Sequence, residues 1–163
     1  MAIRNIVLSP SETLKKVSKE VKVFDEALAT LLDDMYDTMV YNYGVGLAGP
    51  QIGVLKRVVV IEINGIKLDL VNPKIIKREG SCRDVEACLS VKGVQGWVTR
   101  PEKVTITAFD REGNQFEFTG VGHMAQCICH ELDHLDGILF TDVMDEVYMS
   151  GGKKNKKKNK GND

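Results

Sequence analysis

The sequence has few histidines and no long apolar run. Only three histidines stand among its 163 residues. No stretch in residues 1–16 or later is apolar for long enough to form a signal peptide or a membrane span, so we expect a cytoplasmic protein. The four cysteines, at positions 82, 88, 127 and 129, lack zinc-finger spacing. In a reducing compartment, disulfides between them are not expected.

Length and charge predict one domain with a basic tail. The hydrophobic content of 43% over 163 residues suits a single core. Six lysines and one aspartate give residues 150–163 a net charge of +5, which leaves −6 on residues 1–149. We therefore predict a single acidic domain over residues 1–149 and a lysine-rich, disordered tail over residues 150–163.

Two of the three histidines belong to one short motif, His130-Glu131-x-x-His134. Residues four apart on a helix lie on the same face, so both rings can converge on one metal ion. Glu131 can then take a proton from a water at the metal, which is why the pattern indicates a hydrolytic metal site. The alternative is an exposed helix with a charged face whose histidines share this spacing by chance.

A hydrolytic site of this kind needs a third protein ligand. Downstream, Phe140 occupies the place where the long metalloprotease pattern has its last histidine, and it cannot bind a metal. His123 precedes His130 by seven residues, which is about 10 Å along a helix axis and too far to share the ion. The third ligand should therefore come from upstream, where the cysteines are the best candidates.

The four cysteines differ in their suitability as the third metal ligand. Cys129 should face away from the histidines, and Cys127 shares their helix, where it would compete with them for space. Cys82 falls in a predicted strand and can be ordinary core. Cys88 lies in a segment, residues 86–90, that shows no regular pattern, and a loop there can bring a thiolate across to the helix. We therefore favour Cys88.

The remaining pattern predicts an α+β fold in which antiparallel or mixed strands pack around the late histidine helix. Predicted elements are a short helix capped by Ser9 or Ser11, a helix capped by Asp25 and ending near Tyr41, strands over 57–63, 66–71, 74–83, 103–110 and 115–119, and a helix from about Gly122. Asn64-Gly65 is a hairpin turn between the first two strands.

A glycine-rich segment follows the first long helix. Residues 43–53 contain four glycines, which allow the backbone to approach a ligand closely. No Gly-Lys-Ser/Thr sequence follows, so a phosphate loop is a poor explanation. A substrate-binding loop with Gln51 as its polar group fits better, and the alternative is a plain connector.

Three segments resemble the signature motifs of peptide deformylases, in order and at the family's spacing. They are Gly44-Val-Gly-Leu-Ala-Gly-Pro-Gln51, Glu86-Ala-Cys-Leu-Ser90 and Cys129-His-Glu-Leu-Asp-His-Leu-Asp-Gly137. The similarity covers about residues 1–147. It implies a metal-dependent enzyme that removes the formyl group from the N-formylmethionine of nascent peptides and releases formate.

The resemblance also implies roles for individual residues. The implied metal ligands are Cys88, His130 and His134. Glu131 would be the general base and then the proton donor, and the Gln51 amide and the Leu89 backbone N–H would face the oxyanion. The native metal would be Fe²⁺, with Zn²⁺, Ni²⁺ or Co²⁺ often replacing it in preparations.

The implied substrate-binding residues depart in part from the family pattern. They are Val45, Gly46, Ala87, His123, Gln126 and Cys127. His123 and Gln126 stand where the family is mostly apolar; both either point to solvent or change the preference for the first residue. Elsewhere in the motifs, Gly49 and Ala87 replace alanine and glycine, and Cys129 replaces glutamine.

Other functions and partners remain as alternatives. The same motif could serve a metallopeptidase, whereas a non-catalytic binding module would not need Glu131, Gln51 and Cys88 together. We expect a monomer that binds an N-formylmethionyl peptide and neither DNA nor a membrane. The lysine-rich tail either contacts ribosomal RNA or serves only solubility.

Overall fold

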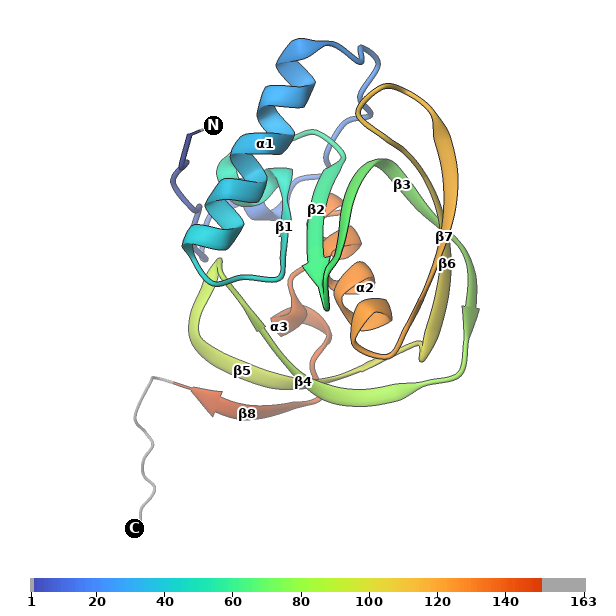
Figure 1. Cartoon of the computed structure of the whole chain (residues 1–163). Helices are drawn as coiled ribbons and strands as arrows, with labels where there is room; N and C mark the ends of the chain where they lie inside the picture. Colours follow the sequence, from blue (N-terminus) through green and yellow to red (C-terminus); the bar gives the residue numbers. More distant parts are fainter. Residues whose placement is uncertain (1, 151–163) are drawn as a thin grey trace.

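Two antiparallel sheets and three helices make up the computed structural model, which describes residues 2–150 (Figure 1). The helices are α1 (Glu26–Tyr41), α2 (His123–Leu135) and α3 (Phe140–Val143), with 3-10 turns η1 (Glu12–Lys15) and η2 (Gly49–Ile52). The strands are β1 (Gly46–Ala48), β2 (Val58–Ile63), β3 (Ile66–Glu79), β4 (Cys82–Cys88), β5 (Val91–Arg100), β6 (Lys103–Phe109), β7 (Gln115–Val121) and β8 (Glu146–Ser150). The predicted α+β class is confirmed.

The larger sheet, in the order β1-β2-β3-β6-β7, is buried on both faces at its centre. Side chains alternate along β2: Val59 and Ile61 pack in the cluster that contains α2, while Val58 and Val60 pack in the cluster that contains α1. This double burial explains why residues 58–61 are all apolar. Helix α2 therefore lies against one face of the sheet and α1 against the other.

Local signals placed the helix ends correctly. The side chain of Asp25 accepts a hydrogen bond from Leu28 N at 3.0 Å and begins α1, and Ser11 caps η1. The hairpin between β2 and β3 turns at Asn64 and Gly65, both with positive φ.

The smaller sheet, in the order β4-β5-β8, differs from the prediction. Strands β5 and β8 were not expected, and Cys88 belongs to β4 instead of an irregular segment. The pairing does shift between Glu86 and Cys88, which accounts for the lack of a regular pattern there. The strand predicted over residues 74–83 is divided at Gly80, whose φ is 68°, between β3 and β4.

The predicted tail lies outside the described residues except for Ser150, which ends β8. Strand β8 pairs with β5 from Trp97↔Glu146 to Val94↔Ser150. Over residues 2–150, none of the helices combines the length and the apolar character needed to cross a membrane.

Candidate functional site

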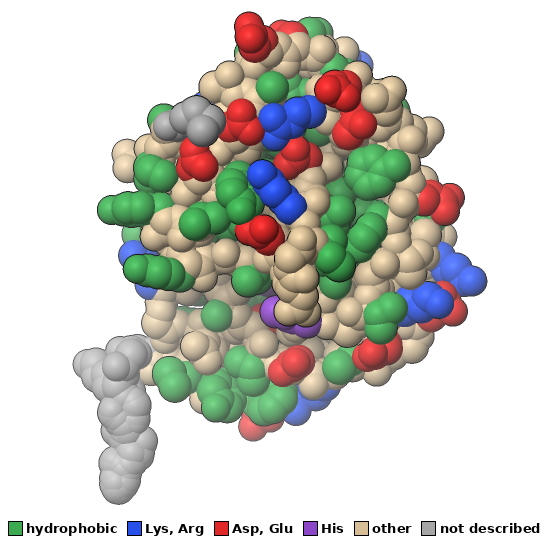
Figure 2. Space-filling view, in the orientation of Figure 1, with side chains coloured by type: hydrophobic (Ala, Val, Ile, Leu, Met, Phe, Trp, Pro, Cys, Tyr) green, Lys and Arg blue, Asp and Glu red, His purple; other side chains and the backbone are tan. Residues whose placement is uncertain are grey.

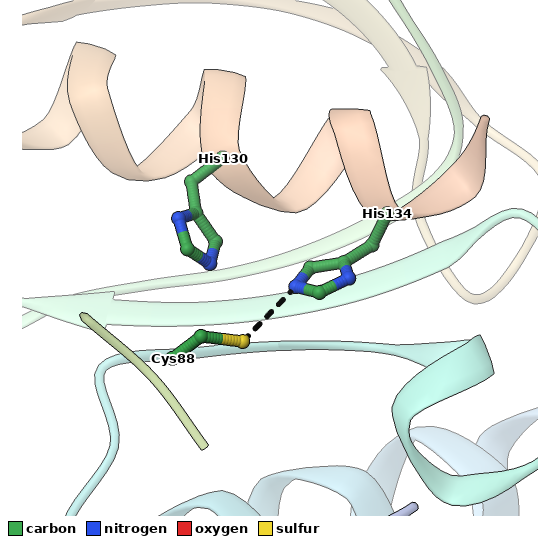
Figure 3. Close-up of side chains that lie close together, drawn as sticks. All are labelled: Cys88, His130 and His134. Atoms are coloured by element: carbon green, nitrogen blue, oxygen red, sulfur yellow. Dashed lines mark hydrogen bonds between the residues drawn. The ribbon is translucent and has the colours of Figure 1, made fainter. Parts of the chain in front are cut away.

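Cys88, His130 and His134 converge in space. Cys88 ends β4, and the two histidines lie one turn apart on α2, so one side chain comes from a strand and two come from a helix (Figure 3). Their potential ligand atoms all lie within 4.8 Å of one another. Cys88 Sγ is 3.4 Å from His134 Nε2. Of the four cysteines, the one favoured from the sequence is the one that the structure brings to the histidines.

The distance between Cys88 Sγ and His134 Nε2 suits two ligands of one divalent ion. With metal–nitrogen bonds near 2.0 Å and metal–sulfur bonds near 2.3 Å, ligand atoms of a tetrahedral site lie about 3.3–3.8 Å apart. The 3.4 Å between Cys88 and His134 falls in that range. Two imidazoles and a thiolate leave a fourth position open, the arrangement of catalytic rather than structural sites.

His130 is oriented by a buried carboxylate. Its Nδ1 lies 2.9 Å from Glu86 Oε1, and because a carboxylate only accepts, Nδ1 carries the hydrogen and Nε2 is left for a metal. Arg100 donates from Nε and Nη2 to Glu86, at 2.9 Å each, and from Nη1 to Asp133 at 2.7 Å. Burial raises the pKa of Glu86, but the hydrogen bonds from Arg100 and His130 outweigh it and lower the pKa to about 2.

This supporting network was missed in the sequence. Glu86 and Arg100 are both buried, at 5% and 8% exposed, and they are 14 residues apart in neighbouring strands. The only available signal was a glutamate two residues before the favoured cysteine.

Phe140, at the place of a third histidine in other metal motifs, stacks on the His130 ring with centroids 6.0 Å apart.

Glu131 is a buried carboxyl with unused hydrogen-bonding capacity. It is 4% exposed, and its Oε1 has no hydrogen-bond partner within residues 2–150. Burial raises its pKa to about 7, although the neighbouring His130 acts in the opposite direction. A carboxyl that titrates near neutrality can both accept and release a proton, as an acid–base catalyst must.

The glycine-rich loop approaches the site closely. A side chain added at Gly46 would lie 2.6 Å from Glu131 Oε2 and 2.9 Å from Cys127 Sγ, so only glycine allows β1 to pass there. At Gly49 an added Cβ would lie 2.7 and 2.8 Å from the carbonyl oxygens of Val54 and Lys56, which accounts for the glycine at this position.

Gln51 lies deep beside the cysteine. Its Oε1 accepts from Ala48 N at 2.9 Å, so its Nε2 must point the other way, 3.2 Å from Ser90 Oγ and 3.5 Å from Cys88 Sγ. The residue is 1% exposed. The side chain is thus held with its N–H donor directed to Ser90 and Cys88.

A cavity of about 310 Å³ opens beside these groups. In Figure 2 the surface is hollowed above the lower part of the molecule, where the smaller sheet lies, and histidine atoms are visible beside the hollow. The cavity is lined by all six predicted substrate-binding residues, Val45, Gly46, Ala87, His123, Gln126 and Cys127. It is also lined by Gln51, Cys88, Leu89, His130 and Glu131.

Some of the remaining residues lie where the sequence predicted, and others do not. His123 is exposed, as expected for a solvent-facing group, but Gln126 is half-buried and its Nε2 donates to the Val85 carbonyl at 3.4 Å. Cys82 is exposed rather than part of the core, because β4 begins at the surface. Cys129 is buried in the apolar cluster between α2 and the larger sheet, which also contains Cys127.

These features define a class of protein: a hydrolase whose site combines a Cys-His-His cluster, a buried carboxyl and an amide donor around one cavity. The comparisons with known proteins agree. The polypeptide deformylase family model matches residues 3–149. A peptide deformylase from Acetivibrio thermocellus is 50% identical over 164 residues, covering 98% of this chain and 96% of the relative, and one from Caldicellulosiruptor bescii is 55% identical over 142 residues, covering 87% and 86%.

A solved structure supports the same assignment. The crystal structure of a peptide deformylase from Legionella pneumophila superimposes with a TM-score of 0.86 at 49% identity, covering 88% of this chain and 86% of that one. The chain belongs to the polypeptide deformylase family. Its activity is the metal-dependent removal of the N-formyl group from nascent peptides.

Proposed function

We propose that Cys88 Sγ, His130 Nε2 and His134 Nε2 bind the metal ion of this deformylase. The convergence of these three atoms within 4.8 Å is the observation that carries the proposal. Fe²⁺ is the proposed native ion, and the donor set also accommodates Zn²⁺, Ni²⁺ or Co²⁺. When bound, the ion lowers the pKa of a coordinated water and polarises the formyl carbonyl. Glu86 acts as a positioning residue that fixes the His130 tautomer.

Different protein groups then transfer the proton and stabilise the developing negative charge. Glu131 accepts a proton from the attacking water while the water oxygen bonds to the formyl carbon. The Gln51 amide and the Leu89 N–H donate hydrogen bonds to the negative charge that grows on the formyl oxygen. As the C–N bond breaks, Glu131 returns its proton to the leaving amine, so formate and a free amino terminus result.

The peptide is proposed to enter between two sheet edges. Strand β1 is the edge of the larger sheet and β4 the edge of the smaller one, and residues of both line the cavity. An extended peptide can pair with such edges as an added strand. Val45, Gly46 and Ala87 flank its backbone in this arrangement. The side chain of its first residue then lies toward His123, Gln126 and Cys127 on α2.

A direct assay tests this function. Protein purified without oxygen, with its metal content measured, should release formate from formyl-Met-Ala-Ser. Cleavage of the unformylated peptide without formate release would indicate the rival metallopeptidase instead.

A second candidate is a deformylase with an altered first-residue preference, and the half-buried Gln126 amide in the cavity wall favours it. The side-chain carbonyl oxygen of Gln126 can accept a hydrogen bond from a polar first residue of the substrate. We expect Gln126→Leu to raise the kcat/KM ratio of formyl-Met-Ala-Ser over formyl-Gln-Ala-Ser by about tenfold. Formyl-Leu-Ala-Ser controls for size. A wild-type enzyme with a strong methionine preference and an unchanged ratio in the variant would contradict the idea.

We further propose a cytoplasmic monomer that meets nascent chains at the ribosome, with the lysines of residues 150–163 contacting RNA phosphates. Cosedimentation with ribosomes should then decrease on truncation after Ser150, and the binding of the full chain should fall as salt rises. Equal pelleting of the two proteins at each salt concentration would leave the tail a solubilising role.

A further inference from the structure

Tyr43 occupies a position that favours glycine. It follows the last turn of α1 with a φ of 61°, in the left-handed region. Its N–H donates to Val40 O at 3.0 Å, and the next N–H, of Gly44, donates to Met39 O at 2.9 Å, which closes the helix. Glycine or asparagine would make the same turn with less steric conflict, since a bulky residue rarely adopts this conformation.

The Tyr43 side chain is not part of the hydrophobic core. It is 96% exposed, the most exposed of the large hydrophobic side chains in the described part of the chain. A strained backbone that presents an aromatic ring to solvent is therefore unexplained by packing. Such features are found where a ligand is contacted.

The location of Tyr43 indicates which ligand it contacts. Tyr43 lines the cavity of the active site, together with Leu89 and the 43% exposed Val45. The Leu89 side chain lies against Gly44, where an added Cβ would be 2.8 Å from Leu89 Cδ1. The rim of the cavity is thus apolar at this end.

The distance along the chain indicates which part of the substrate reaches Tyr43. Gly46 passes beside Glu131, where the formyl group must lie. Tyr43 is three residues earlier, so its Cα lies at most about 10 Å from that of Gly46. A peptide that runs alongside residues 46 to 43 from the reacting carbon therefore brings its second or third residue to the ring.

We propose that Tyr43 is a specificity-determining residue that contacts an apolar or aromatic side chain at the second or third position of the formylated peptide. The proposal rests on the proposed seating of the peptide between β1 and β4. Tyr43 makes this contact equally in the ground state and the transition state, because it is remote from the reacting atoms. Its loss should therefore raise KM more than it lowers kcat.

The test compares formyl-Met-Ala-Ala with formyl-Met-Phe-Ala and formyl-Met-Ala-Phe. For wild type we expect one phenylalanine peptide to have a kcat/KM about three- to tenfold above that of the alanine peptide. Tyr43→Asn, which suits the left-handed turn, should bring that ratio to about one, mainly through KM, whereas Tyr43→Phe should keep it. Tyr41→Asn is the matched control, because Tyr41 is 68% exposed at the same helix end and does not line the cavity.

Each outcome is decisive. The same ratio in wild type and Tyr43→Asn would overturn the proposal, and so would an equal loss on all three peptides, which would indicate a role in shaping the loop. A melting temperature of Tyr43→Asn at or above that of wild type supports the view that the ring does not serve the fold. Absence of formate from every peptide with the metal-loaded wild type would overturn the proposed function, and the role of Tyr43 with it.

Discussion

Replacing Glu131 by glutamine should lower kcat for formate release by about 10²- to 10⁴-fold, the range associated with general acid–base catalysis. Glutamine keeps the size of the side chain, which matters because Glu131 is buried and Gly46 passes against it. It cannot accept a proton from water or return one to the leaving amine. The metal should remain bound, since Glu131 is outside the group formed by Cys88, His130 and His134.

Metal content and turnover must be measured on the same preparation of Glu131→Gln. Glu117→Gln is a suitable control, because Glu117 is an exposed residue of β7 and does not line the cavity. Both variants should retain one metal per chain, and only the first should lose turnover. If Glu131→Gln released formate at a rate within a few-fold of wild type, Glu131 would not be the base.

Cys88→Ala should lose both the metal and the activity. The thiolate is the only negatively charged member of the proposed ligand set, and its removal leaves two neutral imidazoles on one helix, a weaker and more open site. The measurements are metal content after dialysis and formate release with added Fe²⁺, Zn²⁺ or Ni²⁺. Circular dichroism should show a folded protein, because Cys88 is only half-buried.

The chain provides its own controls for this experiment. Cys82 begins the same strand that Cys88 ends and is exposed, so Cys82→Ala should keep full occupancy and activity. Cys129→Ala should also keep the metal, although it leaves a small void in the core beside α2. Stoichiometric metal in Cys88→Ala would show that another side chain completes the site.

Much of the fold could be predicted because it depends on local rules. The Asp25 cap, the Asn64-Gly65 turn and the four-residue spacing of His130 and His134 each involve residues that are close in the sequence. The choice of Cys88 needed only elimination among four cysteines. Because two imidazoles lie on one face of a helix, the third ligand must come from a segment beside that face.

The parts that could not be predicted depend on contacts between distant residues. Strand β8 is exposed along its whole length and has no alternation to reveal it; it forms because it pairs with β5. The contacts of Arg100 with Glu86 and Asp133 join residues 14 and 33 positions apart. No periodicity encodes such a contact, because only the finished sheet brings the partners together.

The place of β8 in the smaller sheet has a consequence for biosynthesis. Translation proceeds from the amino terminus, and Glu146–Ser150 is made after every other helix and strand of residues 2–150. While that segment is still inside the ribosome, β5 has an unfilled edge and the strand bearing Cys88 belongs to a two-stranded ribbon, a marginal structure by itself. The newborn enzyme should therefore acquire its ion only near the end of its own synthesis, and loading of the metal and completion of the sheet should reinforce each other.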